Sequence, residues 1–246
     1  MDQAPETRDF FTSHRRSFFL SCGAASAVGM WGATASSCLA LDALTREQRD
    51  AMSPDDVIEL AKKGNKRFLA GIRQERDFLR EQTSSAAGQF PAMIVLSCVD
   101  SRAPAEIIMD LGIGDAFNAR VAGNIANDDI LGSMEFACAA AGAKLVLVMG
   151  HTACGAIKGA IDEVELGNLT GLLAKIRPAV DATKFDGDRI SKNASFVDAV
   201  ARTNVERTVA AVREQSAVLR DLESKGSVKV VGAMYDIHTA AVTFLA

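Results

Sequence analysis

Residues 145–155 read LVLVMGHTACG, and this stretch decides the fold of the chain. Its first five residues are apolar without any alternation, a pattern typical of a strand buried on both faces of a parallel sheet. A glycine and several polar residues then end the strand, and a helix is expected at residues 154–166. A buried parallel strand needs neighbouring strands on both sides, so the same pattern should recur along the chain.

The pattern does recur, both before and after this stretch. Short apolar runs predict further strands at residues 92–96, 116–121, 228–234 and 241–245. Helical stretches lie between them, at residues 104–111, 128–141, 169–180 and 196–224. Alternating strands and helices predict an α/β fold with a mostly parallel central β-sheet, flanked by helices on both faces.

An N-terminal helical arm, residues 53–82, is predicted ahead of the first strand. Ser53 is expected as the N-cap of a helix that runs to about Gly71, with Asp56 at the capping-box position. A second helix is expected at residues 74–82, followed by a loop of small and polar residues at 84–89.

Residues 1–40 have the layout of an export signal. Arg15 and Arg16 precede the letters SFFL, and no charged residue follows until Asp42. Paired arginines before a mildly apolar segment resemble a twin-arginine signal, which predicts transient contact with export machinery and a periplasmic location. Small residues at 33–35 offer a cleavage site. Two alternatives remain: an uncleaved membrane anchor, because about 25 uncharged residues can span a bilayer, or a disordered tail.

The composition of the whole chain limits its class and its partners, and it is consistent with one domain in residues 41–246. Of 246 residues, 48% are hydrophobic and 24% are charged, as in an ordinary globular protein with one domain of this size. The formal net charge of -4 gives no basic field for a phosphate backbone, which argues against nucleic acid as a partner. Five cysteines are too few for a disulfide scaffold, so each must be judged by its neighbours.

Candidate metal ligands follow two of the predicted strands. Cys98, Asp100 and Arg102 lie two residues apart where one strand ends, and side chains at this spacing point the same way in extended chain. His151 and Cys154 are expected to share a face in the first turn of a helix. Because ligands bind at the carboxyl ends of parallel strands, both ends should bring Cys98, His151 and Cys154 together.

Two thiolates and one imidazole suit a zinc ion, and three protein ligands leave a fourth position open for water. The helix N-terminus should favour the ionised form of Cys154. Each residue alone is weak evidence, and a disulfide between Cys98 and Cys154 is an alternative reading. Cys138 is expected to serve packing, and His238 to be a turn residue.

Three motifs together resemble the β-carbonic anhydrases: CVDSR at residues 98–102, RVAGN at 120–124 and GHTACG at 150–155. The resemblance extends from about Ser53 to the end of the chain. It implies one zinc ion per chain on Cys98, His151 and Cys154, accompanied by the catalytic pair Asp100 and Arg102. It also implies a homodimer or homotetramer, with the site at an interface between chains.

The same resemblance implies substrate-binding positions at Gln89, Phe117, Phe136 and Gly155. Phe136 replaces a tyrosine common in the family, which keeps an apolar wall but removes a hydroxyl. Val95 stands where the bicarbonate-regulated subgroup has a tryptophan, which argues against that regulation in this chain.

The implied activity is the reversible hydration of carbon dioxide to bicarbonate and a proton. Zinc lowers the pKa of its bound water to about 7, so that a hydroxide can attack carbon dioxide at neutral pH. Arg102 should hold Asp100 ionised and away from the metal, although Asp100 is a possible fourth zinc ligand in a closed state. The alternatives are a hydrolase of a related heterocumulene such as carbon disulfide, and a non-catalytic zinc-binding regulatory protein.

Overall fold

The structure is a computed structural model that describes residues 42–245. The predicted export signal, residues 1–40, lies outside the described residues. Within residues 42–245, no helix is both long enough and apolar enough to cross a membrane.

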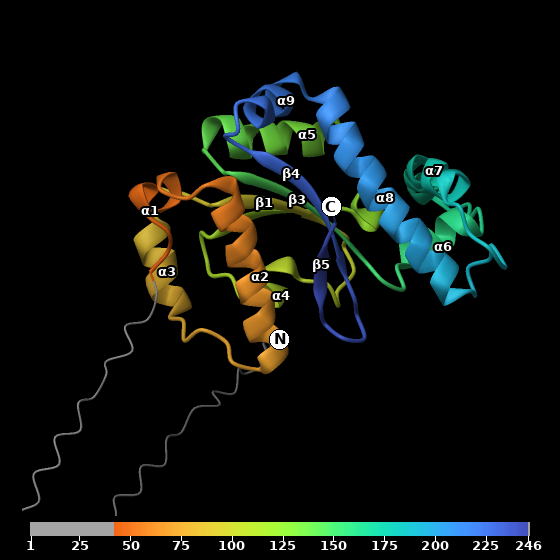
Figure 1. Cartoon of the computed structure of the whole chain (residues 1–246), viewed down its shortest axis with the longest axis horizontal. Helices are drawn as coiled ribbons and strands as arrows, with labels where there is room; N and C mark the ends of the chain where they lie inside the picture. Colours follow the sequence, from red (N-terminus) through yellow and green to blue (C-terminus); the bar gives the residue numbers. More distant parts are fainter. Residues whose placement is uncertain (1–41, 246) are drawn as a thin grey trace, which may run out of the picture. The chain divides into compact units, whose positions relative to one another are not determined.

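A five-stranded sheet forms the centre of the described region (Figure 1). Its strands run in the order β2-β1-β3-β4-β5. The strands are β1 (Met93–Ser97), β2 (Ala116–Arg120), β3 (Leu145–His151), β4 (Lys229–Tyr235) and β5 (Val242–Phe244). All pairings are parallel except β4 with β5, which is antiparallel. The predicted α/β fold and all five predicted strands are therefore confirmed.

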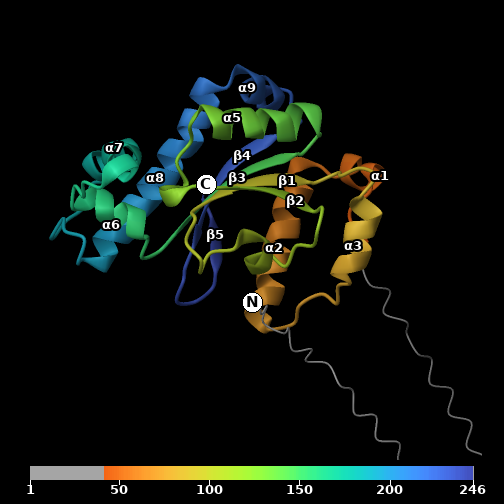
Figure 2. The same cartoon turned by 180° about the vertical axis from the view of Figure 1, so that it is seen from behind.

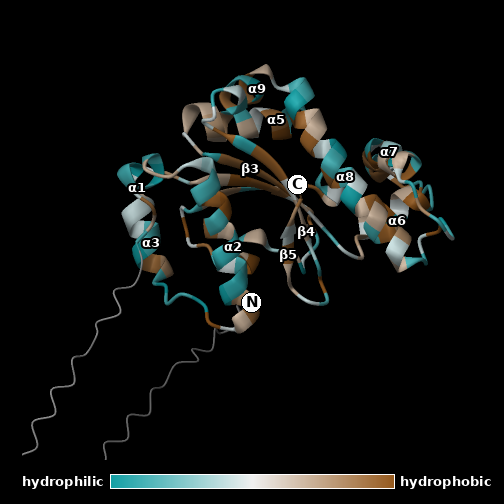
Figure 3. Ribbon diagram, in the orientation of Figure 1, coloured by the Kyte–Doolittle hydropathy of each residue, from teal (hydrophilic) through white to brown (hydrophobic). Residues whose placement is uncertain are grey.

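Buried apolar residues explain the central place of β1 and β3. Every residue of both strands is buried, and Figure 3 shows the strands as a hydrophobic layer beneath more polar helices. The absence of alternation in the sequence of β3 follows from this position, because both of its faces are covered.

Helices cover both faces of the sheet (Figures 1 and 2). One face packs against α2 (Pro54–Ala70) and α4 (Ala105–Ile108), in a core that includes Val57, Val95 and Leu147. The other face packs against α5 (Asp128–Glu135), α8 (Ala194–Gln215) and α9 (Ala217–Ser224). A third cluster joins α6 (Gly155–Ile161), α7 (Gly167–Ala182) and α8, and it contains Cys98 and Cys154.

Two glycines let α8 lie close against β3 and β4. A Cβ atom at Gly150 would come within 2.5 Å of Val205 Cγ2, and one at Gly232 within 2.7 Å of Val205 Cγ1. These distances are too short for any side chain, so Val205 packs directly over bare backbone. The position of α8 relative to the carboxyl ends of the strands is thereby fixed.

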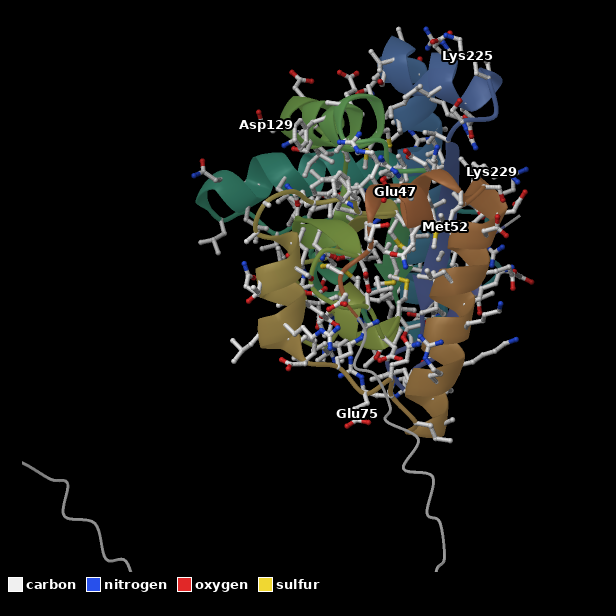
Figure 4. The ribbon with its side chains drawn as sticks, turned by 90° about the vertical axis from the view of Figure 1, so that its left-hand side faces the viewer. Glu47, Met52, Glu75, Asp129, Lys225 and Lys229 are labelled. Atoms are coloured by element: carbon white, nitrogen blue, oxygen red, sulfur yellow. The ribbon has the colours of Figure 1, made fainter. Side chains whose placement is uncertain are left out.

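The predicted helical arm consists of α2 and α3 (Phe78–Ser85), preceded by the short unpredicted helix α1 (Arg46–Asp50). Ser53 and Asp56 form the expected capping box. Because Asp77 caps α3, this helix begins four residues later than predicted. The sequence around Glu75 joins the lower ends of α2 and α3 in Figure 4. Since α2 buries Val57 and Ala61 against its own sheet, it belongs to the core of this chain.

A cluster of ion pairs ties the segment between α2 and α3 to the loop after α4. Asp110 is fully buried, and its carboxylate accepts hydrogen bonds from Arg67 Nε at 2.6 Å and Arg73 Nε at 3.1 Å. Arg76 donates to the buried Glu81 at 2.8 Å and to the backbone carbonyl of Asp110 at 3.0 Å. Paired in this way, the buried charges are tolerated.

Several predicted helix boundaries were wrong. The helix at 154–166 ends at Ile161, and that at 104–111 covers only α4. Residues 128–141 form α5 followed by a π-helical turn, η2 (Phe136–Ala140). The single helix predicted at 196–224 is interrupted at Ser216, whose hydroxyl accepts a hydrogen bond from the N–H of Leu219 and so caps α9.

Candidate metal centre

Cys98 directly follows β1 and is buried. Its Sγ atom accepts a hydrogen bond of 3.4 Å from the N–H of Gly123. Arg120 at the end of β2 holds the same loop by its backbone, since Nε donates to the carbonyl of Cys98 at 2.9 Å and Nη2 to that of Asp100 at 2.6 Å. The RVAGN motif therefore anchors the loop that carries Cys98 and Asp100.

His151 is the last residue of β3, and Cys154 is the N-cap of α6. The prediction that both lie in the first turn of one helix was wrong. Instead, Thr152 and Ala153 form a turn between strand and helix, with Ala153 in the left-handed region at φ 54°. Hydrogen bonds hold Thr152 to β4, because its N–H donates to the carbonyl of Tyr235 at 3.0 Å.

The ligand atoms of Cys98, His151 and Cys154 all lie within 4.8 Å of one another, and all three residues are buried. His151 Nδ1 lies 2.9 Å from the carbonyl oxygen of Thr152, and because a carbonyl oxygen only accepts, Nδ1 donates this hydrogen bond. In the neutral ring this bond leaves Nε2 as the acceptor, and among residues 42–245 the buried Nε2 has no hydrogen-bond partner. An unpaired His151 Nε2 beside the sulfurs of Cys98 and Cys154 is the arrangement that a zinc ion requires, and these are the three ligands that the sequence predicted.

The two sulfurs lie 4.0 Å apart, and both cysteines are free thiols rather than a disulfide. A hydrogen bond from Cys154 lowers the pKa of Cys98 to about 4. The same bond, together with burial, raises the pKa of Cys154, although backbone N–H groups at the start of α6 act in the opposite direction. The expected ionisation of Cys154 by the helix is thus outweighed by its neighbour. Two buried sulfurs this close cannot both ionise without a cation between them.

Asp100 and Arg102 lie at the rim of this cluster. Arg102 binds the carboxylate with two nitrogens, Nε to Oδ1 at 3.0 Å and Nη2 to Oδ2 at 2.8 Å. This bidentate bond lowers the pKa of Asp100 to about 2, so the group is a carboxylate at neutral pH. Asp100 Oδ2 also lies 3.9 Å from His151 Nε2. The structure therefore brings together five of the predicted site residues.

Comparison with known proteins gives the same result as the geometry. The carbonic anhydrase family model matches residues 93–242. The chain belongs to the β-class carbonic anhydrase family. It is 34% identical over 182 residues to carbonic anhydrase 2 of Mycobacterium tuberculosis, covering 72% of this chain and 85% of that protein. It is 32% identical to a carbonic anhydrase of Mycolicibacterium smegmatis, with the same coverage.

Solved structures of the β-class share the fold. The β-carbonic anhydrase CafA of Aspergillus fumigatus aligns with a TM-score of 0.60 at 28% identity, over 78% of this chain and 90% of that chain. One of two tetrameric β-carbonic anhydrases from Sordaria macrospora aligns with a TM-score of 0.58 at 26% identity, over 65% and 83% of the two chains.

The predicted substrate-binding residues of this carbonic anhydrase do not all reach the metal centre of their own chain. Gly155 begins α6, directly after Cys154, and has no atom within 4 Å of the position its Cβ would take. Gln89 precedes β1 whereas Cys98 follows it, so a strand of five residues, about 16 Å long, lies between them.

Phe117 and Phe136 also lie away from the metal centre. Phe117 is paired in register with Ile94, four residues or about 13 Å along β1 from Cys98. The two phenylalanine rings pack edge to face, with centroids 6.0 Å apart, beside a cavity of about 730 Å³. Phe136 is 57% exposed, which is unusual for a phenylalanine in the wall of a closed site.

Three other residues have clear positions. Cys138 is buried in η2, and burial raises the pKa of its thiol to about 12, as expected for a packing residue. His238 lies exposed in the turn between β4 and β5. The role of Arg120 was missed: the residue stood in a quoted motif, but nothing in the sequence shows that its side chain reaches the carbonyls of another loop.

Proposed function

We propose that this protein catalyses the reversible hydration of carbon dioxide to bicarbonate and a proton, with one zinc ion per chain on Cys98, His151 and Cys154. The carrying observation is the buried cluster of two sulfurs and one orphaned imidazole nitrogen, with an ionised carboxylate 3.9 Å from that nitrogen. A structural zinc site has four protein ligands and no need of Asp100. Membership of the carbonic anhydrase family supports the same reaction.

Cys98, His151 and Cys154 would hold the zinc ion, which would supply Lewis acidity and lower the pKa of bound water to near 7. Asp100 is suited to orient the reacting oxygen, because a carboxylate with a pKa of about 2 only accepts hydrogen bonds. Arg102 holds Asp100 by a bidentate bond, which fixes the direction of its free lone pairs. Buried apolar surroundings exclude bulk water from the sulfurs.

Association of two chains completes the substrate pocket in this proposal. Gln89 precedes β1, Phe117 lies on β2 beside Ile94, and Phe136 packs on Phe117, so all three lie away from the metal centre of their own chain. We infer that they serve the centre of a second chain. Gln89 donates its amide to a bicarbonate oxygen there, and the phenylalanines form a wall for apolar carbon dioxide. The high exposure of Phe136 supports this role, and the related Sordaria macrospora enzymes are tetrameric.

Export to the periplasm through a twin-arginine signal in residues 1–40 is the proposed location. The signal is cleaved, and the catalytic domain of residues 41–246 is released. Replacing Arg15 and Arg16 with Lys should keep the activity in the cytoplasm on cell fractionation. Activity that stays in the periplasm would exclude this route, and activity that sediments with membranes would show an uncleaved anchor instead.

Carbon dioxide hydration by the purified protein tests the proposed reaction, with carbon disulfide assayed in parallel. Cys98→Ala should abolish both hydration and zinc binding. Cys138→Ala is the matched control, because it removes a buried thiol outside the cluster and should keep both. Equal hydration by the two variants would contradict the proposal, as would hydrolysis of carbon disulfide without hydration of carbon dioxide.

A further inference from the structure

One half of the metal centre depends on an unfavourable backbone conformation at Ala153. The residue has φ 54°, in the left-handed region that costs a residue with a Cβ atom free energy. The conformation sets the turn that directs His151 and Cys154 toward the same point. A conformation of this kind persists where the surrounding structure holds it.

Asp198 on α8 stabilises this conformation of Ala153. Its Oδ1 atom accepts a hydrogen bond of 2.9 Å from the N–H of Ala153. A charged acceptor makes a stronger bond with a backbone N–H than a neutral one does. Asp198 itself touches neither zinc ligand in the hydrogen-bond network, so its effect on them passes through the turn.

Asn204, six residues further along α8, holds the other half. Its Nδ2 atom donates a buried hydrogen bond of 2.8 Å to the carbonyl of Gly123. The N–H of Gly123 in turn donates to Cys98 Sγ at 3.4 Å. Gly123 has φ 69°, and a Cβ atom there would lie 2.4 Å from Ile176 Cδ1, so this backbone has little room to move.

Both contacts come from a helix whose position is itself fixed. Val205 of α8 packs over Gly150 and Gly232, where it occupies the space that a Cβ atom would need at either position. The zinc ligands lie at or just after the ends of the two strands β1 and β3. Through Asp198, α8 contacts the turn after β3, and through Asn204 it contacts Gly123 in the loop after β2, whose N–H reaches Cys98 Sγ.

We propose that Asp198 and Asn204 are positioning residues of the metal centre, which set the separation of Cys98 from His151 and Cys154 through Ala153 and Gly123. This inference rests on the proposed binding of zinc by these three residues. Groups that hydrogen-bond directly to a metal ligand typically change metal affinity 10- to 100-fold when they are lost. Asp198 and Asn204 act one step further from the ligands, so the expected loss lies at or below the lower end of that range. Without these two hydrogen bonds the protein still has all three zinc ligands. The ligands would then have to become ordered when zinc binds, which lowers the affinity.

The test measures zinc affinity by competition with a chromogenic chelator for Asp198→Ala, Asn204→Ala and Asp198→Asn. Both alanine variants should bind zinc more weakly, by up to about 10-fold. Asp198→Asn keeps an oxygen acceptor for the N–H of Ala153 and should recover most of the loss. Glu206→Ala is the control: it lies on the exposed face of α8, in an ion pair with Arg202, and should leave affinity unchanged.

Two further readouts separate positioning from mere stability. Cobalt substituted for zinc reports the sulfur ligands by its thiolate charge-transfer absorption, which should weaken or shift in both alanine variants. The unfolding temperatures of the metal-stripped variants should stay close to that of the metal-stripped wild type, although their zinc affinities fall. Asn204 is buried and its variant can unfold, whereas Asp198 is only partly buried, so Asp198→Ala decides the question.

Wild-type affinity and cobalt spectrum in a folded Asp198→Ala variant would overturn the inference while leaving the proposed function intact. A wild-type protein that binds cobalt without thiolate absorption would overturn the proposed function itself.

Discussion

Asp100 Oδ2 lies 3.9 Å from His151 Nε2, the nitrogen that faces the two sulfurs. The same oxygen accepts a hydrogen bond of 2.8 Å from Arg102 Nη2. A carboxylate this close to a zinc ligand atom can itself become a ligand, and Arg102 holds it back. Activity therefore depends on whether Asp100 stays bound to Arg102 or moves to the zinc ion.

Arg102→Ala should retain zinc but lose nearly all carbon dioxide hydration, because the released Asp100 carboxylate takes the position that water needs. Arg102→Lys should fall between, since an ammonium cannot bind a carboxylate in the bidentate manner of a guanidinium. Stopped-flow hydration and zinc content are measured together. Near-native rates in Arg102→Ala would show that the pair is only a structural salt bridge.

In the wild type, carbon dioxide hydration should be slow below about pH 7 and become faster above it, because zinc-bound water loses its proton near that pH.

Asp110→Asn should destabilise the fold in a pH-dependent way. Burial alone would raise the pKa of Asp110, but hydrogen bonds from Arg67, the N–H of Gln74 and Arg73 outweigh it and hold the pKa below 3.8. The carboxylate therefore contributes stability above its unfolded pKa, and this contribution is lost as the pH falls through the lower folded pKa.

At pH 7 the Asn variant should lose about 2 kcal/mol or more in free energy of unfolding. Urea titrations at several pH values check this. The difference between the two proteins should stay constant above about pH 5 and shrink below about pH 4. A difference that does not change with pH would mean that shape rather than charge matters at this position.

Gly232→Ala should cost about 1 to 3 kcal/mol of stability, because its Cβ atom would overlap Val205. Combining it with Val205→Ala removes the methyl groups that collide, so the double variant should be more stable than the sum of the single losses predicts. A double-mutant cycle from urea unfolding measures this coupling. Strictly additive losses would show that α8 does not pack on the sheet through these residues.

Leu79→Asp should weaken association between chains. Leu79 on α3 is 81% exposed, and an exposed leucine beside the equally apolar Phe78 is typical of a protein contact. A point substitution is preferable to deletion of residues 53–82, because α2 is part of the core. Light scattering should give a smaller species and the hydration rate should fall. Ile190→Asp, at a 50% exposed site in the loop between α7 and α8, is the control. Unchanged mass and rate in Leu79→Asp would exclude this contact.

The sequence predicted the strands well because their apolar runs are short and strongly bounded. Helix ends were less predictable. Apolar residues continue on both sides of Ser216, and the break there depends on a buried hydroxyl that also donates to Glu135, 81 residues away along the chain. The π-helical turn at residues 136–140 likewise has no signal in the local pattern.

The metal ligands were predictable because two of them share one strand end and the motifs are specific. Their environment was not. The hydrogen bonds between Asp198 and the N–H of Ala153 and between Asn204 and the carbonyl of Gly123 join segments 45 and 81 residues apart. Neither Asp198 nor Asn204 stands in a recognisable motif. The lowered pKa of Cys98 was also not predicted, because its main cause is the hydrogen bond from Cys154, whose sulfur lies 4.0 Å away.

Zinc titration of the metal-stripped protein, with carbon dioxide hydration followed at each addition, is the decisive measurement of whether bound zinc makes this protein a catalyst. The rate should start near the uncatalysed value, rise in proportion to added zinc and level off at one zinc ion per chain. A hydration rate that survives complete removal of zinc, or a protein that binds one zinc ion per chain and still does not hydrate carbon dioxide, would contradict the proposed function.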